Sequence, residues 1–305
     1  MKIMDILAFL QEKQIPFTFS GDHQKYLEWF SSINHYKPGT FTWIKSQRNI
    51  PPEYAPQRIT LAFVQEAVNA GPIPNIIQTP ESKRAFFSTI EHFYGKEGER
   101  PAIGRFTYIS PKVKLGKNVR IGHNCTLDGD IIVDDGTVIW NHVTVLNRVH
   151  IGKHCDIHSG VVIGHDGFAY TEDATGRKTM VKHFGGVWIG NHVLIGENAC
   201  VSRGTIEDTI LADGVKIDSL SHIAHNCNLE EGAAMAGPCR ASGSVHIGKN
   251  AYLAGSIIRN QCTVGERAFT GVGAVVVQDV ASGETVVGNP AKPFARKKES
   301  SHGIH

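Results

Sequence analysis

The sequence predicts a mainly β protein, in which a small α/β domain precedes a long parallel β-helix with triangular coils. Three observations predict this fold. An aliphatic residue recurs at every sixth position over much of the chain after residue 100, glycine often follows that position, and the first hundred residues lack the repeat. Glycine makes up 32 of the 305 residues, above its usual share of roughly 7%. We expect domains over residues 1–100 and 101–290, followed by a short basic tail over 291–305.

Composition narrows the class of protein. Hydrophobic residues at 41% and charged residues at 20% are typical of a soluble globular chain. The formal charge of +2 gives nucleic-acid binding little electrostatic support. No apolar run approaches the ~18 residues of a membrane span, and the first ten residues do not form a signal peptide. Six cysteines without CxxC spacing argue against a disulfide framework or a zinc ribbon, so we expect a cytoplasmic protein.

The first hundred residues mix helical and strand patterns. Residues 4–10 indicate a short helix, and residues 42–44 and 59–64 indicate strands. An amphipathic helix is predicted between Pro80 and Gly95, because proline favours a first turn and glycine favours a helix end. Residues 96–104 form the predicted linker, polar and marked by Gly and Pro.

The six-residue spacing is unbroken from Leu115 to Ile163 and resumes after two interruptions. It fits neither the period of a helix nor simple strand alternation, but it fits a short strand and a corner repeated three times per turn. We call the aliphatic residue at every sixth position the frame residue. It should point toward the interior of the coil, as should the residue four positions later. Each coil buries this interior only by stacking on its neighbours. Four cysteines fall on such inward positions, where we interpret them as interior filler: Cys125, Cys155, Cys227 and Cys239.

The first interruption is an insertion of 20 residues between the frame positions Ile163 and Ile189. We call the predicted triangular β-helix the prism. A regular prism does not require an insertion, and loops of this length are often functional. The alternative interpretation is a solvated loop that decorates a corner. A second, shorter interruption separates Val201 from Leu211.

Two segments carry a resemblance to a known family. The stretches IGHDGFAY (163–170) and KIDSLSHIAHN (216–226) resemble segments of the UDP-3-O-acylglucosamine N-acyltransferases of lipid A synthesis, in which an IAHN segment bears the catalytic histidine. Hexapeptide prisms in general resemble the left-handed β-helix of acyl- and acetyltransferases. The resemblance implies a left-handed coil and a homotrimer with active sites between adjacent prisms. It covers roughly residues 30–290, strongly in the prism and weakly before it.

The resemblance places His225 at the position of the general base. The chemistry agrees, because an amino sugar attacks a thioester only as the free amine and an imidazole can take the proton near neutral pH. Asn226 would orient this ring or bind sugar, and His222 would contact the substrate in the same cleft. The alternative for any single histidine is a solvated residue at the edge of the prism.

Further substrate contacts are expected beside and within the insertion, from His158, His165, Asp166, Phe168 and Tyr170. In the amino-terminal domain, Trp43 stands where the family has an aromatic residue that stacks on uracil. The family's following asparagine and tyrosine are replaced here by Ser46 and Asn49, and its second histidine, near Gln261, is absent. The alternative for Trp43 is a place in the core of the small domain.

The carboxy-terminal part departs from the family pattern. The family ends in a helical extension that helps to hold acyl carrier protein, whereas this sequence stops soon after GNPAKP (288–293). That ending is similar to hexapeptide enzymes that use acetyl-CoA, whose last coil and basic tail lie near the coenzyme. We therefore expect acetyl-CoA as co-substrate, with contacts from Gly255, Gly273, Asn289, Lys292 and Arg296.

The first functional hypothesis is an N-acetyltransferase that moves an acetyl group from acetyl-CoA to the amine of a nucleotide-linked amino sugar, for bacterial surface polysaccharides such as O-antigen. The second is an N-acyltransferase that uses 3-hydroxyacyl-acyl carrier protein. From other classes, a zinc carbonic anhydrase on a β-helix would need two ligand histidines five residues apart, a spacing absent here. A non-catalytic scaffold would leave both motifs unexplained. No metal is expected.

Overall fold

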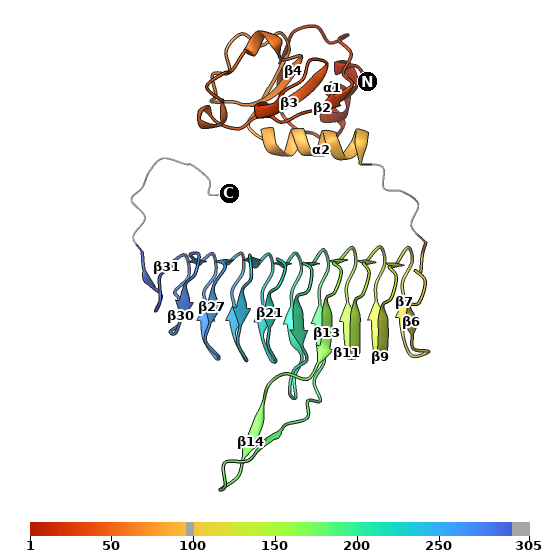
Figure 1. Cartoon of the computed structure of the whole chain (residues 1–305), viewed down its shortest axis with the longest axis vertical. Helices are drawn as coiled ribbons and strands as arrows, with labels where there is room; N and C mark the ends of the chain where they lie inside the picture. Colours follow the sequence, from red (N-terminus) through yellow and green to blue (C-terminus); the bar gives the residue numbers. More distant parts are fainter. Residues whose placement is uncertain (96–100, 295–305) are drawn as a thin grey trace. The chain divides into compact units, whose positions relative to one another are not determined.

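The computed structural model describes residues 1–95 and 101–294. The chain divides into two compact units, Met1–Glu99 and Arg100–His305. The first unit is a small α/β domain and the second is a β-helix of stacked coils (Figure 1). Within the described residues no helix is both long enough and apolar enough to cross a bilayer.

The amino-terminal unit is built on a five-stranded sheet with the strand order β1-β5-β4-β3-β2. Strands β2 to β5 run parallel, and β1 is antiparallel to β5. The strands are β1 (Thr18–Ser20), β2 (Trp29–Phe30), β3 (Thr40–Ile44), β4 (Leu61–Gln65) and β5 (Ile76–Thr79), and the short 3-10 helices are η1 (Ile33–His35), η2 (Gln47–Asn49) and η3 (Pro56–Arg58). Phe41, Phe63 and Ile77 are fully buried in its main core. Both predicted strands are confirmed.

Two helices complete this unit, and both were predicted. In α1 (Ile3–Glu12), the buried residues recur at helical spacing, so one face of the helix packs on the core. Helix α2 (Ser82–Tyr94) ends at Gly95 as expected. It begins at Ser82 and not in the turn containing Pro80, because Thr79 still pairs with Gln65 as the last residue of β5.

The β-helix has three faces, which the chain visits in order. The first face carries β8 (Arg120–Ile121), β10 (Val138–Ile139), β12 (Asp156–Ile157), β17 (Leu194–Ile195), β20 (Lys216–Ile217), β23 (Ala234–Ala236), β26 (Tyr252–Ala254), β29 (Phe269–Thr270), β31 (Thr285–Val287) and β32 (Lys292–Pro293). The second carries β6 (Tyr108–Ile109), β13 (Val162–His165), β18 (Cys200–Ser202), β21 (His222–Ile223), β24 (Arg240–Ala241), β27 (Ile257–Ile258) and β30 (Val275–Val276). The third carries β7 (Lys114–Leu115), β16 (Val187–Ile189), β19 (Thr209–Leu211), β22 (Asn228–Leu229), β25 (His246–Ile247) and β28 (Thr263–Val264). Strands β9 (Thr126–Val133) and β11 (Thr144–Ile151) run unbroken from the second face to the third.

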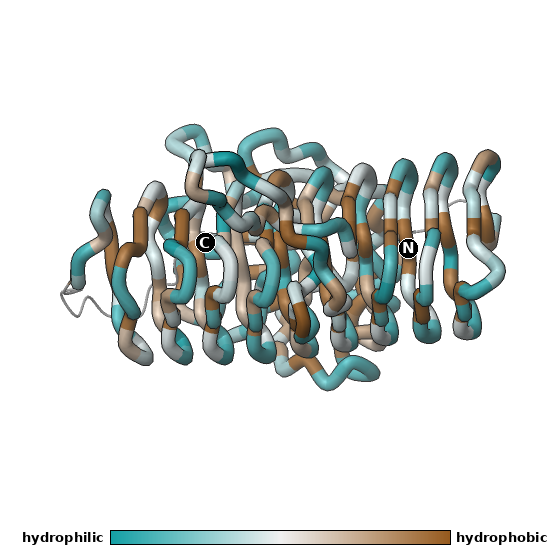
Figure 2. Tube along the Cα trace, turned by 90° about the horizontal axis from the view of Figure 1, so that it is seen from below, coloured by the Kyte–Doolittle hydropathy of each residue, from teal (hydrophilic) through white to brown (hydrophobic). Residues whose placement is uncertain are grey.

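The repeat fills the interior as predicted. Frame residues such as Ile121, Ile139 and Ile157 lie in register on successive coils and are buried. Hydrophobic segments accordingly recur along the coils (Figure 2). Leu115 differs, with 38% of its surface exposed, because it lies in a coil at the amino-terminal end of the stack. The four predicted filler cysteines are buried, and burial raises the pKa of Cys227 to about 11, which disfavours a nucleophilic thiolate.

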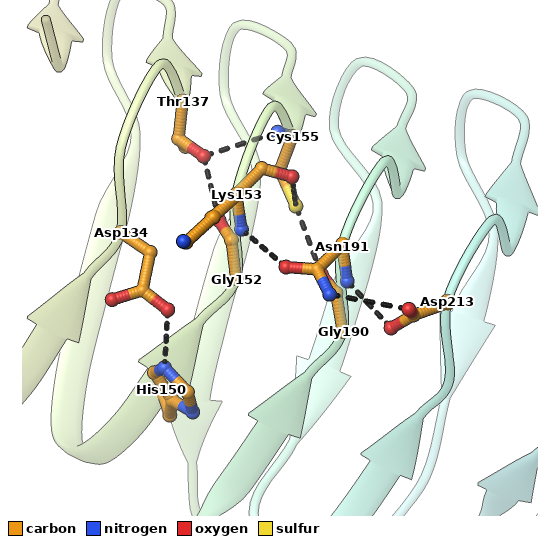
Figure 3. A network of polar contacts seen from close by, with 9 residues as sticks. All are labelled: Asp134, Thr137, His150, Gly152, Lys153, Cys155, Gly190, Asn191 and Asp213. Carbon is orange, nitrogen blue, oxygen red and sulfur yellow. Dashed lines mark hydrogen bonds and ion pairs between the residues drawn. The ribbon is translucent and has the colours of Figure 1, made fainter.

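We call the corners first, second and third, each following the face of that number. Polar side chains join successive coils at the third corner (Figure 3). The side-chain oxygen of Asn191 accepts a hydrogen bond from the backbone N–H of Lys153 at 2.9 Å, and the backbone N–H of Asn191 donates to the carboxylate of Asp213 at 2.8 Å. The hydroxyl of Thr137 accepts from the backbone N–H of Cys155 at 3.0 Å. These links satisfy corner N–H groups that the strands leave unpaired.

Both interruptions of the repeat leave the prism at the second corner. The 20-residue insertion departs after β13, forms the antiparallel hairpin of β14 (Tyr170–Glu172) and β15 (Lys178–Met180), and returns at β16. The hairpin projects away from the coils (Figure 1). The shorter loop, residues 203–208, departs one coil later, between β18 and β19. The two insertions therefore mark one corner of the structure.

The carboxy-terminal end of the described chain is ordered into the prism. Strand β32 pairs antiparallel with β31, so the predicted tail begins with a strand. Its backbone turns back after Asn289 and extends the first face by one strand. Arg296 lies outside the described residues.

Candidate active site

His225 lies at the second corner, between β21 and β22, on the coil that follows the 203–208 loop. Its neighbour Asn226 turns the corner with φ near +60°, a conformation that asparagine tolerates better than most residues. The backbone N–H of Asn226 donates to the buried hydroxyl of Thr209 at 2.9 Å. The corner is therefore held to the preceding coil.

The contacts of Asn226 determine which nitrogen of His225 carries hydrogen. The Asn226 oxygen Oδ1 accepts from the backbone N–H of Thr205 at 3.2 Å and from its hydroxyl at 2.9 Å. A backbone N–H can only donate, so the amide oxygen faces this cluster. The same oxygen lies 3.0 Å from Nδ1 of His225. Nδ1 must therefore donate, which leaves the lone pair on Nε2 available to take a proton.

Two glycines make room for this imidazole. Gly243 occupies the same corner one coil later, where an added Cβ would lie 2.7 Å from Nε2 and from Cε1 of His225. Gly167, from the insertion, approaches the other edge, where a Cβ would lie 2.9 Å from Cδ2. Real Cβ atoms do not approach a ring so closely, so both positions require glycine for the observed pose of His225.

Asp166 connects the start of the insertion with its end and with the shorter loop. One of its carboxylate oxygens accepts from the backbone N–H of His183 at 3.3 Å, and the other lies 3.8 Å from the guanidinium of Arg203. Arg203 is buried and donates from Nε to the carbonyl of Gly185 at 2.6 Å. The predicted substrate contact Asp166 thus joins the start of the insertion to its end.

His183 is a residue of this site that the sequence did not single out. Its ring lies 5.5 Å from that of His225, centroid to centroid, and nearly perpendicular to it. The imidazole is almost fully buried. Its only signal in the sequence is its position near the end of the insertion, where the chain rejoins the repeat.

His222 lies on the second face, three residues before His225. In the ladder of parallel strands it stands between Cys200 and Arg240, and it points outward because Ile223 points inward. Burial, followed by the positive charges of Arg240 and His225, lowers the pKa of His222. The neutral form of His222 is therefore favoured relative to an ordinary imidazole, and His225 lies close enough to contribute to this shift.

The aromatic residues of the insertion are exposed. Phe168 has 75% of its surface exposed and contacts Tyr170 edge to face at 5.8 Å. His165 is also exposed, and its carbonyl accepts from the backbone N–H of Arg203 at 2.9 Å. Phe168 and Tyr170 are on the insertion that packs against His225 through Gly167, and His165 is the residue of β13 from which the insertion departs.

His158 lies elsewhere. It follows β12 and stands at the first corner, where its Nδ1 is 3.1 Å from Glu197 and its Nε2 is 3.2 Å from Asp156. One carboxylate thus lies next to each ring nitrogen of His158. The structure does not bring it to the corner of His225.

The residues predicted to bind acetyl-CoA gather at the carboxy-terminal coils. Gly255 and Gly273 stack at the first corner, where the N–H of Gly273 donates to the carbonyl of Gly255 at 3.1 Å. Asn289 lies in the turn between β31 and β32, and Lys292 lies in β32. Gly255, Gly273 and Asn289 are thus at the first corner and Lys292 is on the first face, away from the corner of His225. Arg296 is not among the described residues.

Trp43 borders a pocket of about 340 Å³ in the amino-terminal unit. Its ring stacks on Phe86 at 6.2 Å, and its Nε1 donates to the hydroxyl of Ser82 at 3.0 Å. Asn49 also lines the pocket, whereas Ser46 donates to the Asn49 side chain at 2.7 Å. Trp43 therefore combines the two predicted possibilities, with one part packed on the core and another facing a cavity.

The described part of the chain holds no group of three or more His, Cys, Asp or Glu side chains placed to bind a metal ion.

Comparison with known proteins supports the family resemblance. No family model matches the chain. The UDP-3-O-acylglucosamine N-acyltransferase of Xanthomonas oryzae pv. oryzae is 48% identical over 96 residues, covering 32% of this chain and 28% of that protein. The enzyme of the same name from Janthinobacterium sp. is 36% identical over 152 residues, covering 50% and 43%.

Among solved structures, LpxA from Acinetobacter baumannii, a UDP-N-acetylglucosamine acyltransferase, matches with a TM-score of 0.59 and 24% identity, covering 64% of this chain and 74% of that one. The prism therefore has the left-handed β-helix fold of hexapeptide-repeat acyltransferases. The predicted fold class and its handedness are confirmed. The match spans less than half the length of the curated relatives.

Proposed function

We propose that the chain transfers an acyl group from a thioester to the amine of a UDP-linked glucosamine-type sugar, with His225 as the general base. The observation that carries the proposal is the fixed orientation of His225, whose Nδ1 is held by Asn226 while Nε2 keeps its lone pair. The name of the relatives, UDP-3-O-acylglucosamine N-acyltransferase, supplies the substrate class.

The chemistry follows from that orientation. Nε2 of His225 takes a proton as the sugar amine attacks the thioester carbonyl, which forms the C–N bond and a tetrahedral oxyanion. The C–S bond then breaks, the thiolate leaves, and the imidazolium returns its proton to the sulfur. The Asn226 oxygen favours the transient imidazolium because it accepts from Nδ1. Backbone N–H groups of the prism would stabilise the oxyanion.

The amino-terminal unit is proposed to hold the base of the sugar nucleotide. Trp43 offers a flat aromatic surface beside a pocket that Phe30 and Phe87 also line. The side chains of Lys45 and Asn49 supply polar groups at its edge. An aromatic surface with few polar groups suits a planar pyrimidine.

For the acyl donor, the relatives support the second hypothesis better than the first, because they are named N-acyltransferases and not acetyltransferases. Apolar side chains on the two insertions favour a longer acyl chain: Phe168, Phe184 and Ile206 are 75%, 70% and 81% exposed. The two insertions are joined by a hydrogen bond from the N–H of Phe184 to the carbonyl of Thr205. We therefore propose a 3-hydroxyacyl group on acyl carrier protein as donor.

Acetyl-CoA remains the second candidate donor because Gly255, Gly273, Asn289 and Lys292 gather at the last coils. We further propose that the enzyme works in the cytoplasm as a homotrimer and that its product enters bacterial surface glycolipid or polysaccharide synthesis.

The donor is tested with purified protein, a panel of UDP- and dTDP-linked amino sugars, and either 3-hydroxyacyl-acyl carrier protein or acetyl-CoA. Thiol release and the mass of the sugar product are measured. We expect amide formation on a UDP-linked sugar with the longer donor. Turnover with acetyl-CoA alone would return the assignment to acetyl transfer, and no turnover with any pair would contradict acyl transfer.

A further inference from the structure

His183 is held against His225 by contacts on its backbone and its ring. Its backbone N–H donates to Asp166 at 3.3 Å, and the next residue, Phe184, donates to Thr205 at 2.8 Å. Thr205 in turn donates to Asn226, which holds the other side of His225. The two imidazoles therefore belong to one connected assembly, although they lie on different coils.

The hydrogen bonds of His183 determine its tautomer. Its Nδ1 lies 2.9 Å from the carbonyl oxygen of Val181, which can only accept, so Nδ1 carries the hydrogen. The neutral ring consequently has its lone pair on Nε2. That atom is buried and has no hydrogen-bond partner among the described residues.

The unpartnered nitrogen lies beside the ring of His225. Gly167 lies between the two rings. A Cβ atom added to Gly167 would lie 3.2 Å from Nε2 of His183 and 2.9 Å from Cδ2 of His225. With the ring centroids 5.5 Å apart and the planes at 85°, the two side chains meet edge to face. No side chain separates them, because residue 167 is glycine.

A buried acceptor without a partner costs free energy, and such groups concentrate where function requires them. The unpartnered nitrogen of His183 lies within 3.2 Å of the Cβ position at Gly167, which is itself 2.9 Å from Cδ2 of His225. The acceptor is therefore in place before any charge forms on His225, as in preorganised sites.

We propose that His183 is a positioning residue that acts through His225: its ring holds the His225 imidazole in place, and its buried Nε2 lone pair stabilises the positive charge that His225 acquires on taking the amine proton. This inference rests on the proposed function, in which His225 is the base. In this role His183 acts on the ring of His225 and not on the sugar or the donor.

The test compares two substitutions at residue 183. His183→Asn keeps a donor near Nδ1 for the Val181 carbonyl but has no acceptor at the position of Nε2, whereas His183→Gln places an amide near that position. We expect the Asn variant to lose about tenfold in kcat, the size of one modest electrostatic contact, while KM for both substrates and the melting temperature stay close to those of the parent. The Gln variant should recover most of kcat. His154→Asn, at the third corner, is the matched control and should behave as the parent.

A double-mutant cycle separates the possible roles. In a His225→Asn background, His183→Asn should cause no further loss, because His183 acts through the missing ring. Additive losses, or a raised KM, would show an independent substrate contact and overturn the inference. A lowered melting temperature with unchanged kcat would show a purely structural role and also overturn it. If His225→Asn is itself fully active, the proposed function fails; if only the His183 variants match the parent, the proposed function stands and this inference fails.

Discussion

At the scale of single residues, the site depends on which atom of each side chain is free. A histidine at a prism corner is normally a solvated residue, and His225 differs because Thr205 and Asn226 together fix its tautomer. Gly243 and Gly167 have no Cβ atom, and each therefore leaves space for one edge of the His225 ring. The chemistry of this corner is therefore decided by hydrogen positions and by missing atoms as much as by the imidazole.

His225→Asn should lower kcat by about 10²–10⁴, because loss of a positioned general base has effects of that size. The fold should be retained, since His225 is at a corner and outside the buried frame. Steady-state kinetics and circular dichroism on one preparation measure both effects. A larger loss for His222→Ala than for His225→Asn would assign the base to His222.

Gly243→Ala should lower kcat about tenfold or more, because the new methyl group would lie 2.7 Å from Nε2 and force the ring of His225 out of its position. The backbone at Gly243 does not need a positive φ, so the effect is steric and local. Ser242→Ala, at the adjacent position, is the control. Equal activity of the Gly243 variant and the parent would show that the observed pose of His225 is not required.

His222 should contribute a pH dependence to folding stability. Its pKa is lowered in the folded state, chiefly by burial, so below about pH 6.5 the unfolded chain binds more protons than the folded one. Stability should therefore fall as the pH drops below that value, and His222→Asn should reduce this dependence. Denaturant titrations between about pH 5 and 8 measure it. Identical pH profiles for variant and parent would contradict the assignment.

At the scale of elements, the candidate site of each unit lies where regular strands or helices border irregular segments. In the prism, β13 and β18 are each followed by an insertion at the second corner, and the insertions contact each other and the corner of His225. In the amino-terminal unit, the end of β3 and the face of α2 border the pocket next to Trp43. Regular strands supply rigidity, and the irregular segments attached to them supply the side chains of the candidate sites.

Trp43→Ala should raise the KM for the sugar nucleotide several-fold with kcat nearly unchanged, because loss of an aromatic stack costs on the order of 0.5–1.5 kcal/mol. Because Trp43 also packs on Phe86, the melting temperature should fall somewhat. Trp43→Phe, which keeps an aromatic face, is the control for KM. An unchanged KM together with a lower melting temperature would leave Trp43 with a role in the core alone.

At the scale of the whole molecule, the residues of one chain leave His225 only half-buried, with Gly167 of the insertion and Gly243 of the next coil against its ring. A neighbouring prism would supply a second wall, and cyclic closure with three subunits uses one type of interface repeatedly. Oligomerisation would thus complete a cleft for the acyl donor.

Light scattering should therefore report about three times the 33.3 kDa chain mass. Sedimentation over a range of protein concentrations, with activity measured in parallel, shows whether the trimer is the active form. A monomer with full turnover would exclude both the trimer and a site shared between subunits.

The sequence by itself determined the prism, because a six-residue repeat is a local signal: each frame residue, such as Ile121 or Ile157, is buried by the equivalent residue 18 positions away on the next regular coil. It also indicated His225, because the short segment that contains this residue resembles the segment that bears the catalytic histidine in a known family. Only the tertiary structure decided what surrounds that ring. His183 is 42 residues away in the chain, and Thr205 and Gly243 come from the preceding and following coils. A solenoid superimposes residues that the sequence separates by whole coils and by insertions of irregular length, so no local pattern could pair His183 with His225 or exclude His158 from the same corner.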